Sequence, residues 1–246
     1  LGIKDLQSSA LPLGHAAMRG SLLPPADRIS EPAALLFISN GHGEDLIALR
    51  VLEAIHKRRP LVPLSVLPLV GEGKIFFRAV SDGWLKLLGP SAPLPSGGFS
   101  NQSLRGFLAD FAAGLIRITL NQWKSARIAA RKGFSIVAVG DILPLLMAWS
   151  SGAAYSFIGT PKSDYTWCSG PGYALSDWYH RLKGSEWDPW EFALMRSKRC
   201  KMVAARDLLT ARGLRRHRVK ALAPGNPMMD CLTSDPIPSS INHLRR

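Results

Sequence analysis

ALLFIS, residues 34–39, is followed directly by NGHGED, residues 40–45, and a helical pattern then runs from Leu46 to Arg59. These six residues, five of them apolar, have the length and composition of a strand that is buried on both faces. A buried strand that breaks at two glycines and turns into a helix is how an open α/β sheet forms a ligand site at the carboxyl end of its first strand. The stretch therefore predicts a binding or catalytic α/β domain.

The composition of the turn limits its ligand. Gly41 and Gly43 allow a sharp bend and a close backbone approach, and the new helix offers free N–H groups. Glu44 and Asp45 would repel a phosphate in the first turn, so a sugar hydroxyl or an acceptor head group suits the loop better. No Lys-Ser/Thr pair follows at the spacing of a P-loop. A tight turn with a helix cap is the simpler alternative.

The rest of the chain alternates between strand and helix patterns. Predicted strands are 62–70, 84–88, 135–140, 154–158, 202–205 and 219–222, and predicted helices are 103–131, 142–150 and 207–212. Such alternation predicts an α/β fold with a doubly wound, mostly parallel, Rossmann-like sheet. The loops at Gly41–Asp45, Gly140–Asp141 and Gly159–Tyr165 would then converge on one cleft.

Charge is unevenly distributed along the chain. The 246 residues carry a formal net charge of +13, and Arg196–Lys220 holds ten Lys or Arg and one Asp, ten minus one giving +9. A basic segment can attract nucleic acid, an anionic membrane surface or a phosphorylated ligand, or it can be a solvated helix face. Because no nucleic-acid-binding motif accompanies it, we expect no nucleic-acid partner.

A mixed aromatic and basic segment favours contact with an anionic membrane surface, with packing of a small lobe as the alternative. The residues expected at that surface are Trp178, Arg181, Lys183, Trp187 and Trp190. No run of about 18 uninterrupted apolar residues predicts a membrane span. Three widely spaced cysteines form neither a disulfide framework nor a metal motif. The expected location is cytoplasmic and peripheral at the membrane.

Four motifs taken together resemble the lipid-A-disaccharide-synthase-related family over about residues 33–232. They are Ser39–Ala48 (SNGHGEDLIA), Val139–Asp141 (VGD), Gly159–Tyr165 (GTPKSDY) and Gly225–Asp230 (GNPMMD). That family is similar to GT-B glycosyltransferases, in which one Rossmann-like domain holds the acceptor and a second holds the nucleotide-sugar donor.

Composition and the resemblance together give a domain organisation. Residues 1–32 lack sustained periodicity and would be a tail or truncated start. The resemblance implies that 33–225 is the acceptor domain and 226–246 the crossing toward a donor domain. Only sixteen residues follow Asp230, whereas a second α/β domain needs on the order of 100 residues. The chain would therefore hold the N-terminal acceptor half and would need a donor-binding domain as its partner.

The resemblance also implies a reaction, the transfer of a sugar from a UDP-sugar to a lipid-linked or glycolipid acceptor. The attacking hydroxyl must lose a proton, so a base is needed. Asp141 is the favoured base, with a helix N-cap as its alternative role, and His42 is the second choice.

Further residues would bind the acceptor. Gly41, Gly43, Glu44 and Asp45 would do so at the first turn, and Lys162, Ser163, Asp164 and Tyr165 would hold a phosphate or sugar. No metal site and no cofactor besides the UDP-sugar donor is expected. Two hypotheses of other classes stay open, a non-catalytic lipid- or glycan-binding module and half of a GT-B-like nucleotide-sugar epimerase.

Overall fold

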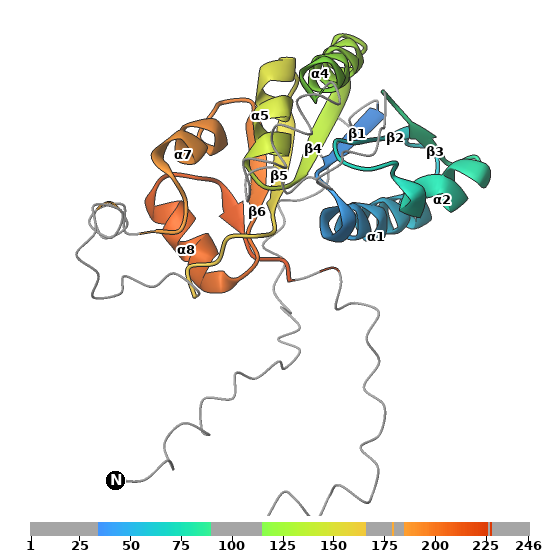
Figure 1. Cartoon of the computed structure of the whole chain (residues 1–246). Coiled ribbons are helices and arrows are strands. Elements are labelled where there is room, and N and C mark those ends of the chain that lie inside the picture. The colour runs from blue at the N-terminus through green and yellow to red at the C-terminus, as the bar shows by residue number, and fades with distance from the viewer. Residues whose placement is uncertain (1–33, 90–114, 166–178, 180–184, 226, 228–246) are drawn as a thin grey trace, which may run out of the picture. The chain divides into compact units, whose positions relative to one another are not determined.

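The computed structural model describes residues 34–89, 115–165, 179, 185–225 and 227, all within one compact unit, Pro32–Arg246. Seven strands form one sheet in the order β3-β2-β1-β4-β5-β6-β7, and every strand pair is parallel (Figure 1). The strands are β1 (Ala34–Ser39), β2 (Leu64–Pro68), β3 (Leu85–Leu87), β4 (Phe134–Gly140), β5 (Tyr155–Gly159), β6 (Cys200–Ala204) and β7 (Ala221–Leu222). The predicted doubly wound α/β fold is confirmed.

Helices cover the two faces of the sheet in different places. One face carries α1 (His42–Arg58), the 3-10 turn η2 (Lys74–Phe76) and α2 (Phe77–Ser81). The other carries α4 (Leu115–Arg131), α5 (Ile142–Ser151), α7 (Pro189–Met195) and α8 (Leu208–Arg216). The chain reverses its direction across the sheet between β3 and β4, and right-handed crossovers therefore place the two groups on opposite sides.

The central strand β1 is buried on both faces, as its continuous apolar run predicts. Leu36 and Ile38 pack into the core beneath α4 and α5, whereas Phe37 packs into the core beneath α1. All three side chains are fully buried. The same alternation in β4 places Ile136 and Ala138 on one side, so the two central strands tie the two cores together.

Several element boundaries differ from the prediction. Helix α1 begins at His42, four residues earlier than the helical pattern indicates, so most of the predicted loop is its first turn. Strand β2 is shorter than the predicted 62–70, and α8 extends four residues past the predicted end of its helix. The part of the predicted long helix before Leu115 lies outside the described residues.

Two regions form helices that the sequence analysis did not predict. The first is η2 with α2, at Lys74–Ser81, which starts after Gly73 in a left-handed conformation. The second is α7, which begins with Asp188 as N-cap, Pro189 at its first position and Glu191 completing a capping box. None of the helices in the described part of the chain is long and apolar enough to cross a membrane.

Phe157 tests the core beneath α5 and α7. Its ring is fully buried and meets the Trp187 ring edge to face, with the ring centroids 6.0 Å apart. We expect Phe157→Ala to lower the free energy of unfolding by about 3–5 kcal/mol, because it leaves a cavity. Urea unfolding followed by circular dichroism measures this change.

Leu61 provides the control, because its side chain is 94% exposed. Leu61→Ala should change the unfolding free energy by less than about 0.5 kcal/mol. Equal effects of the two substitutions would contradict the described packing.

A candidate binding cleft at the carboxyl edge of the sheet

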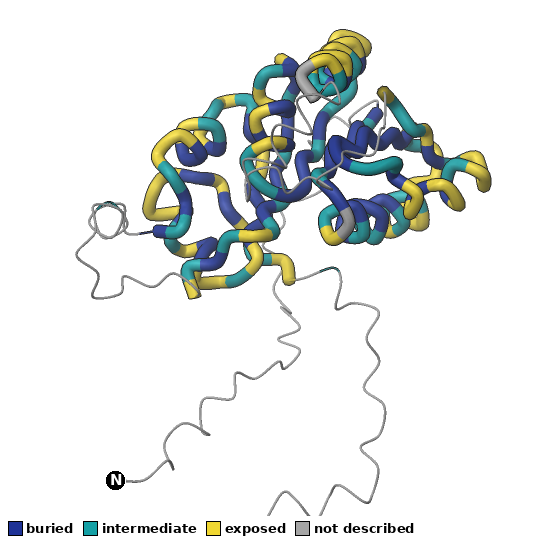
Figure 2. The backbone as a smooth tube through the Cα atoms, in the orientation of Figure 1, coloured by how far each residue is buried: buried dark blue, intermediate teal, exposed yellow. Residues whose placement is uncertain are grey.

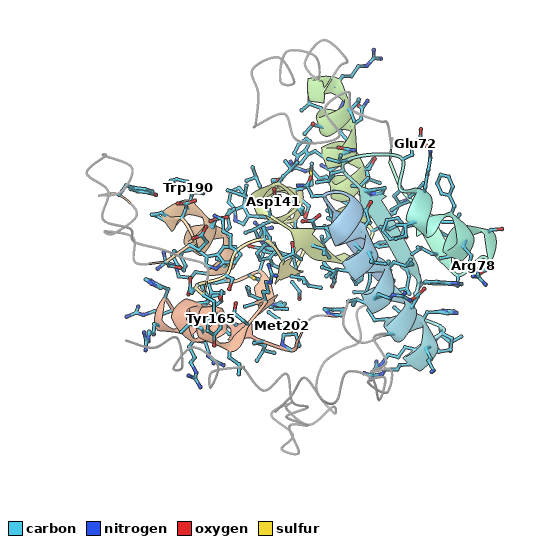
Figure 3. All side chains as sticks on the ribbon, turned by 60° about the horizontal axis from the view of Figure 1, so that its bottom comes forward. Glu72, Arg78, Asp141, Tyr165, Trp190 and Met202 are labelled. Carbon is cyan, nitrogen blue, oxygen red and sulfur yellow. The ribbon has the colours of Figure 1, made fainter. Side chains whose placement is uncertain are left out.

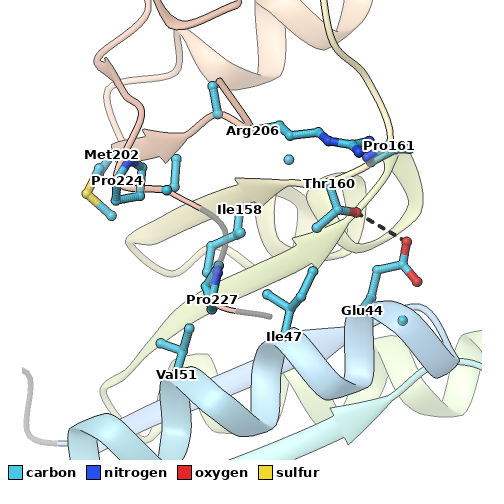
Figure 4. A pocket seen from close by; sticks show the side chains of 15 residues that line it. Glu44, Ile47, Val51, Ile158, Thr160, Pro161, Met202, Arg206, Pro224 and Pro227 are labelled. Atoms are coloured by element: carbon cyan, nitrogen blue, oxygen red, sulfur yellow. Dashed lines mark hydrogen bonds between the residues drawn. The ribbon is translucent and has the colours of Figure 1, made fainter. Parts of the chain in front are cut away.

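A cleft of about 500 Å³ lies at the carboxyl ends of the last three strands, beside α1 (Figure 4). Parallel α/β sheets commonly bind ligands at this edge. The lining residues are Gly43, Glu44, Ile47, Val51, Ile158, Gly159, Thr160, Pro161, Met202, Ala204, Ala205, Arg206, Pro224, Gly225 and Pro227.

Polar groups gather at one end of the cleft. The Thr160 hydroxyl donates a hydrogen bond to Oε1 of Glu44 over 3.2 Å, and Figure 4 shows this pair across the end of the cleft. Arg206 extends above them toward Pro161, and its guanidinium makes no ion pair with any residue that the structure describes. This end can bind a hydroxyl and, at Arg206, a negative charge.

The remaining wall of the cleft is apolar. Ile47 and Val51, one helical turn apart on α1, face Ile158, Met202 and Pro224 from the strand ends. Met202 is 37% exposed although it lies on a strand of a parallel sheet. A cleft with an apolar wall and a few polar groups at one end suits an amphipathic ligand.

The turn between β1 and α1 brings its residues to this edge. Gly41 has a φ of 125°, which L side chains rarely adopt, and it precedes the helix without a side-chain cap. Gly43 and Glu44 follow in the first turn and line the cleft. The backbone of His42 begins the helix, while its side chain lies outside the described part of the structure.

Asp45 occupies a different position from its neighbours. Its side chain is buried and accepts a hydrogen bond from the hydroxyl of Ser39, the last residue of β1. It therefore joins the strand to the helix and is absent from the cleft wall. A buried, paired carboxylate stabilises the turn, and contact of Asp45 with an acceptor stays a prediction.

Asp141 caps α5, as the simpler alternative predicted. Its Oδ1 accepts hydrogen bonds from the backbone N–H of Leu143 and from Nδ2 of Asn40, each over 3.0 Å. Its second oxygen, Oδ2, makes no hydrogen bond to a described residue. Asp141 thus keeps one carboxylate oxygen available beside the turn that follows β1 (Figure 3).

Gly140 connects Asp141 to the polar end of the cleft. Its φ is 129°, and a Cβ at this position would lie 3.0 Å from Cγ of Glu44. Its carbonyl also accepts a hydrogen bond from the Thr160 backbone over 3.3 Å. With this φ, a side chain at Gly140 would be strained and would press on Glu44, so glycine allows β4 to end close to the first turn of α1.

Lys162, Ser163 and Asp164 bind to the last helices of the domain and do not line the cleft. The Lys162 ammonium pairs with Glu191 and with Asp188, 3.3 Å from the latter. The other two contact α8 and its flanks, with Ser163 donating to Asp207 over 2.7 Å and Asp164 accepting from Ser185 over 3.1 Å. Each of these groups has partners within the fold, and their role in holding a phosphate stays a prediction.

Three aromatic residues of the predicted sites lie in different surroundings. Tyr165 is exposed beyond the Lys162 cluster, and Trp190 is 54% exposed at the start of α7. Trp187 is fully buried and packs against Phe157. Membrane contact by Trp187 is therefore wrong, because its ring belongs to the core. Trp178, Arg181 and Lys183 lie outside the described residues.

The described part of the chain contains neither a cluster of metal ligands nor a reactive thiol. No group of three or more His, Cys, Asp or Glu residues there could hold a metal ion. Burial raises the pKa of the Cys200 thiol to about 11, so this side chain stays protonated and is a poor nucleophile at neutral pH.

The sequence analysis missed Met202 and Arg206. Arg206 follows from a rule that the sequence allows, since residues just after a parallel strand lie at the ligand edge, whereas Met202 lies within β6 and has no such signal. Arg206 directly follows β6 and Ala205. It went unnoticed because it belongs to a long basic stretch in which no single cation stands out.

Comparisons with known proteins give no further identification. No protein-family model matches the chain, and no curated protein matches it.

Lys162 provides a test of the structural role of its cluster. Glu191 is almost fully buried, so Lys162→Met should leave its carboxylate without its cation and lower the unfolding free energy by about 3 kcal/mol. Thermal and urea unfolding measure the loss. The double variant Lys162→Met, Glu191→Gln should recover part of it, since it removes the buried charge. A fully stable single variant would contradict the structural role.

Proposed function

We propose that this domain is the acceptor-binding half of a GT-B-like glycosyltransferase, which transfers a sugar from a UDP-sugar to a lipid-linked or glycolipid acceptor. The observation that carries the proposal is the division of the cleft into an apolar wall and one polar end. An amphipathic acceptor needs both. The resemblance of four sequence motifs to the lipid-A-disaccharide-synthase-related family supplies the reaction type.

In this proposal the acceptor head group lies at the polar end. Glu44 and Thr160 would bind its hydroxyl groups, and Arg206 would bind an anionic group. The apolar part of the acceptor would lie along Ile47 and Met202. Binding along the apolar wall would hold the reacting hydroxyl at the sheet edge, where strand β4 ends.

Asp141 is the proposed base. Its Oδ1 is fixed by Leu143 and Asn40, which sets the orientation of the carboxylate, while Oδ2 has no described partner and could accept the proton of the attacking hydroxyl. Gly140 allows the end of β4, which precedes Asp141, to lie close to Glu44 of the cleft wall. A helix cap and a base are compatible roles, because each uses a different oxygen.

A non-catalytic lipid- or glycan-binding module is the second candidate. It is favoured by the cap of α5, because Asp141 already has a structural reason to be at this position. The two candidates share the cleft and differ only in the need for a donor domain and for the free oxygen of Asp141.

Asp141→Asn separates the two roles of this residue. Asn caps helices about as well as Asp, so the unfolding free energy should change by less than about 0.5 kcal/mol. The amide cannot accept the proton as a carboxylate does, so kcat should fall at least about 100-fold. The assay follows radiolabel from UDP-glucose or UDP-N-acetylglucosamine into chloroform-extractable lipid, using a protein that contains both halves.

Met202→Glu tests ligand binding in the cleft independently of sugar transfer. A carboxylate on the apolar wall should weaken binding of membrane-extracted glycolipid to the chain at least about tenfold, because an unpaired charge opposes apolar contact. Native mass spectrometry measures the bound lipid. Leu209→Glu on α8 is the matched control, since Leu209 has similar exposure and lies outside the cleft. Binding with no transfer in a two-domain protein would favour the binding module.

A further inference from the structure

The outer surface of α4 combines cations with exposed aliphatic side chains. The helix contains four Lys or Arg residues and no Asp or Glu. The side chains exposed on it include Arg117, Leu120, Lys124, Arg127, Ile128 and Arg131. Leu120 and Ile128 are 51% and 52% exposed, and both lie on the outer face of the helix.

These residues form one stripe along the helix. Leu120, Lys124 and Ile128 are four residues apart, so their side chains follow one another along the same face. The opposite face is fixed to the domain, because Ala126 is buried and Gln122 donates a hydrogen bond to the Leu69 carbonyl over 3.0 Å. The orientation of the basic, apolar stripe toward the outside is thus set by packing.

Helix α5 extends this surface. It lies beside α4, with Nε1 of Trp123 donating a hydrogen bond to the Ser150 hydroxyl over 3.1 Å, and Figure 2 shows exposed residues on the outer side of both helices. Its exposed side chains are Leu143, Leu146 and Trp149.

Cations also lie over the aromatic rings of this region. The guanidinium of Arg127 is 5.0 Å from the centroid of the Trp123 ring, and that of Arg199 is 5.9 Å from the Trp149 ring. Tryptophan and arginine side by side are typical of proteins at the boundary between lipid head groups and acyl chains.

We propose that the outer surface of α4 and α5, which we call the α4–α5 surface, docks onto an anionic membrane. Cations without neighbouring carboxylates on α4 complement anionic lipid head groups, and the exposed Leu, Ile and Trp side chains can enter the interfacial region. A second copy of the chain is a poorer partner, since it would bring the same positive charges to the contact. A nucleic acid would leave the aliphatic side chains without apolar partners.

This surface differs from the aromatic segment at residues 178–190 and from the cleft. The docking does not depend on glycosyl transfer, so it can be tested separately. Leu143, at one end of the surface, is two residues from Asp141. Docking would therefore place the carboxyl edge of the sheet close to the lipid head groups.

Vesicle flotation with the full chain tests the proposal. Vesicles of phosphatidylcholine alone are compared with vesicles containing about 30% phosphatidylserine, in about 0.1 M NaCl. The chain should float with the anionic vesicles only. Each cation near an anionic surface increases affinity about fivefold, so the triple variant Arg117→Gln, Lys124→Gln, Arg131→Gln should bind on the order of 100-fold more weakly.

A matched variant controls for net charge. Lys57→Gln, Arg58→Gln, Arg78→Gln also removes three exposed cations, but from α1 and α2 on the other face of the sheet. Figure 3 shows Arg78 on α2, far from Trp190 of α7. This variant should keep at least about a third of the affinity of the wild type, because only long-range attraction is reduced.

The apolar part of the surface is tested with Leu120→Gln, Ile128→Gln, Leu146→Gln. These side chains are exposed, so the fold should persist, and circular dichroism checks it. The variant should still bind at low salt but should be released at about 0.5 M NaCl, since only charge attraction remains.

Three outcomes would overturn the proposal. One is equal loss of vesicle binding in the two charge variants, and another is unchanged binding in the α4 variant. The third is binding to a DNA duplex that exceeds vesicle binding and is lost in the α4 variant, which would assign the surface to nucleic acid.

Discussion

The close approach of the first turn of α1 to the end of β4 is the constraint on which the carboxyl edge depends. Gly140 makes it possible, because any Cβ there would meet Glu44. The approach then allows Asn40 to reach Asp141 over 3.0 Å and places Thr160 against both Gly140 and Glu44. Three loops that are far apart in the sequence are thereby joined by short polar contacts. These contacts fix the polar end of the cleft before any ligand binds, which reduces the conformational entropy that binding must overcome.

The strands could be predicted from the sequence because a parallel sheet requires apolar runs that are buried on both faces, and β1 and β4 have them. The same logic located the turn after β1. The sequence analysis did not locate α7, although Asp188, Pro189 and Glu191 have the pattern of a capping box. The aromatic and basic composition around that motif favoured a membrane interpretation. Composition alone could not separate buried Trp187 from exposed Trp190, since the first lies just before the N-cap of α7 and the second in its first turn, and only the folded chain gives them different surroundings.

Site residues are harder to predict from sequence than strands, for a physical reason. A polar side chain after a strand can bind a ligand or stabilise the fold, and the sequence does not distinguish the two. Lys162 and Asp45 took structural roles because each lies within reach of a buried partner, Glu191 and Ser39 respectively. Glu44 differs from Asp45 by one position and therefore lies on another side of the helix, where it lines the cleft. Arg206 lines the cleft because β6 ends two residues before it. The sequence did not single it out, because it belongs to a long basic stretch.

The handedness of the crossovers explains why the domain has an open side at all. Crossovers that move from β1 to β3 place α1 and α2 on one face, and those that move from β4 to β7 place α5, α7 and α8 on the other. No described helix covers the α1 side of β5, β6 and β7, so Met202 and Leu222 remain exposed there. Such a half-covered face is costly in a parallel sheet, which normally buries both sides. Here the uncovered strands and the side of α1 together form the apolar wall of the cleft, so the topology that leaves the sheet incomplete is the same feature that creates the cleft.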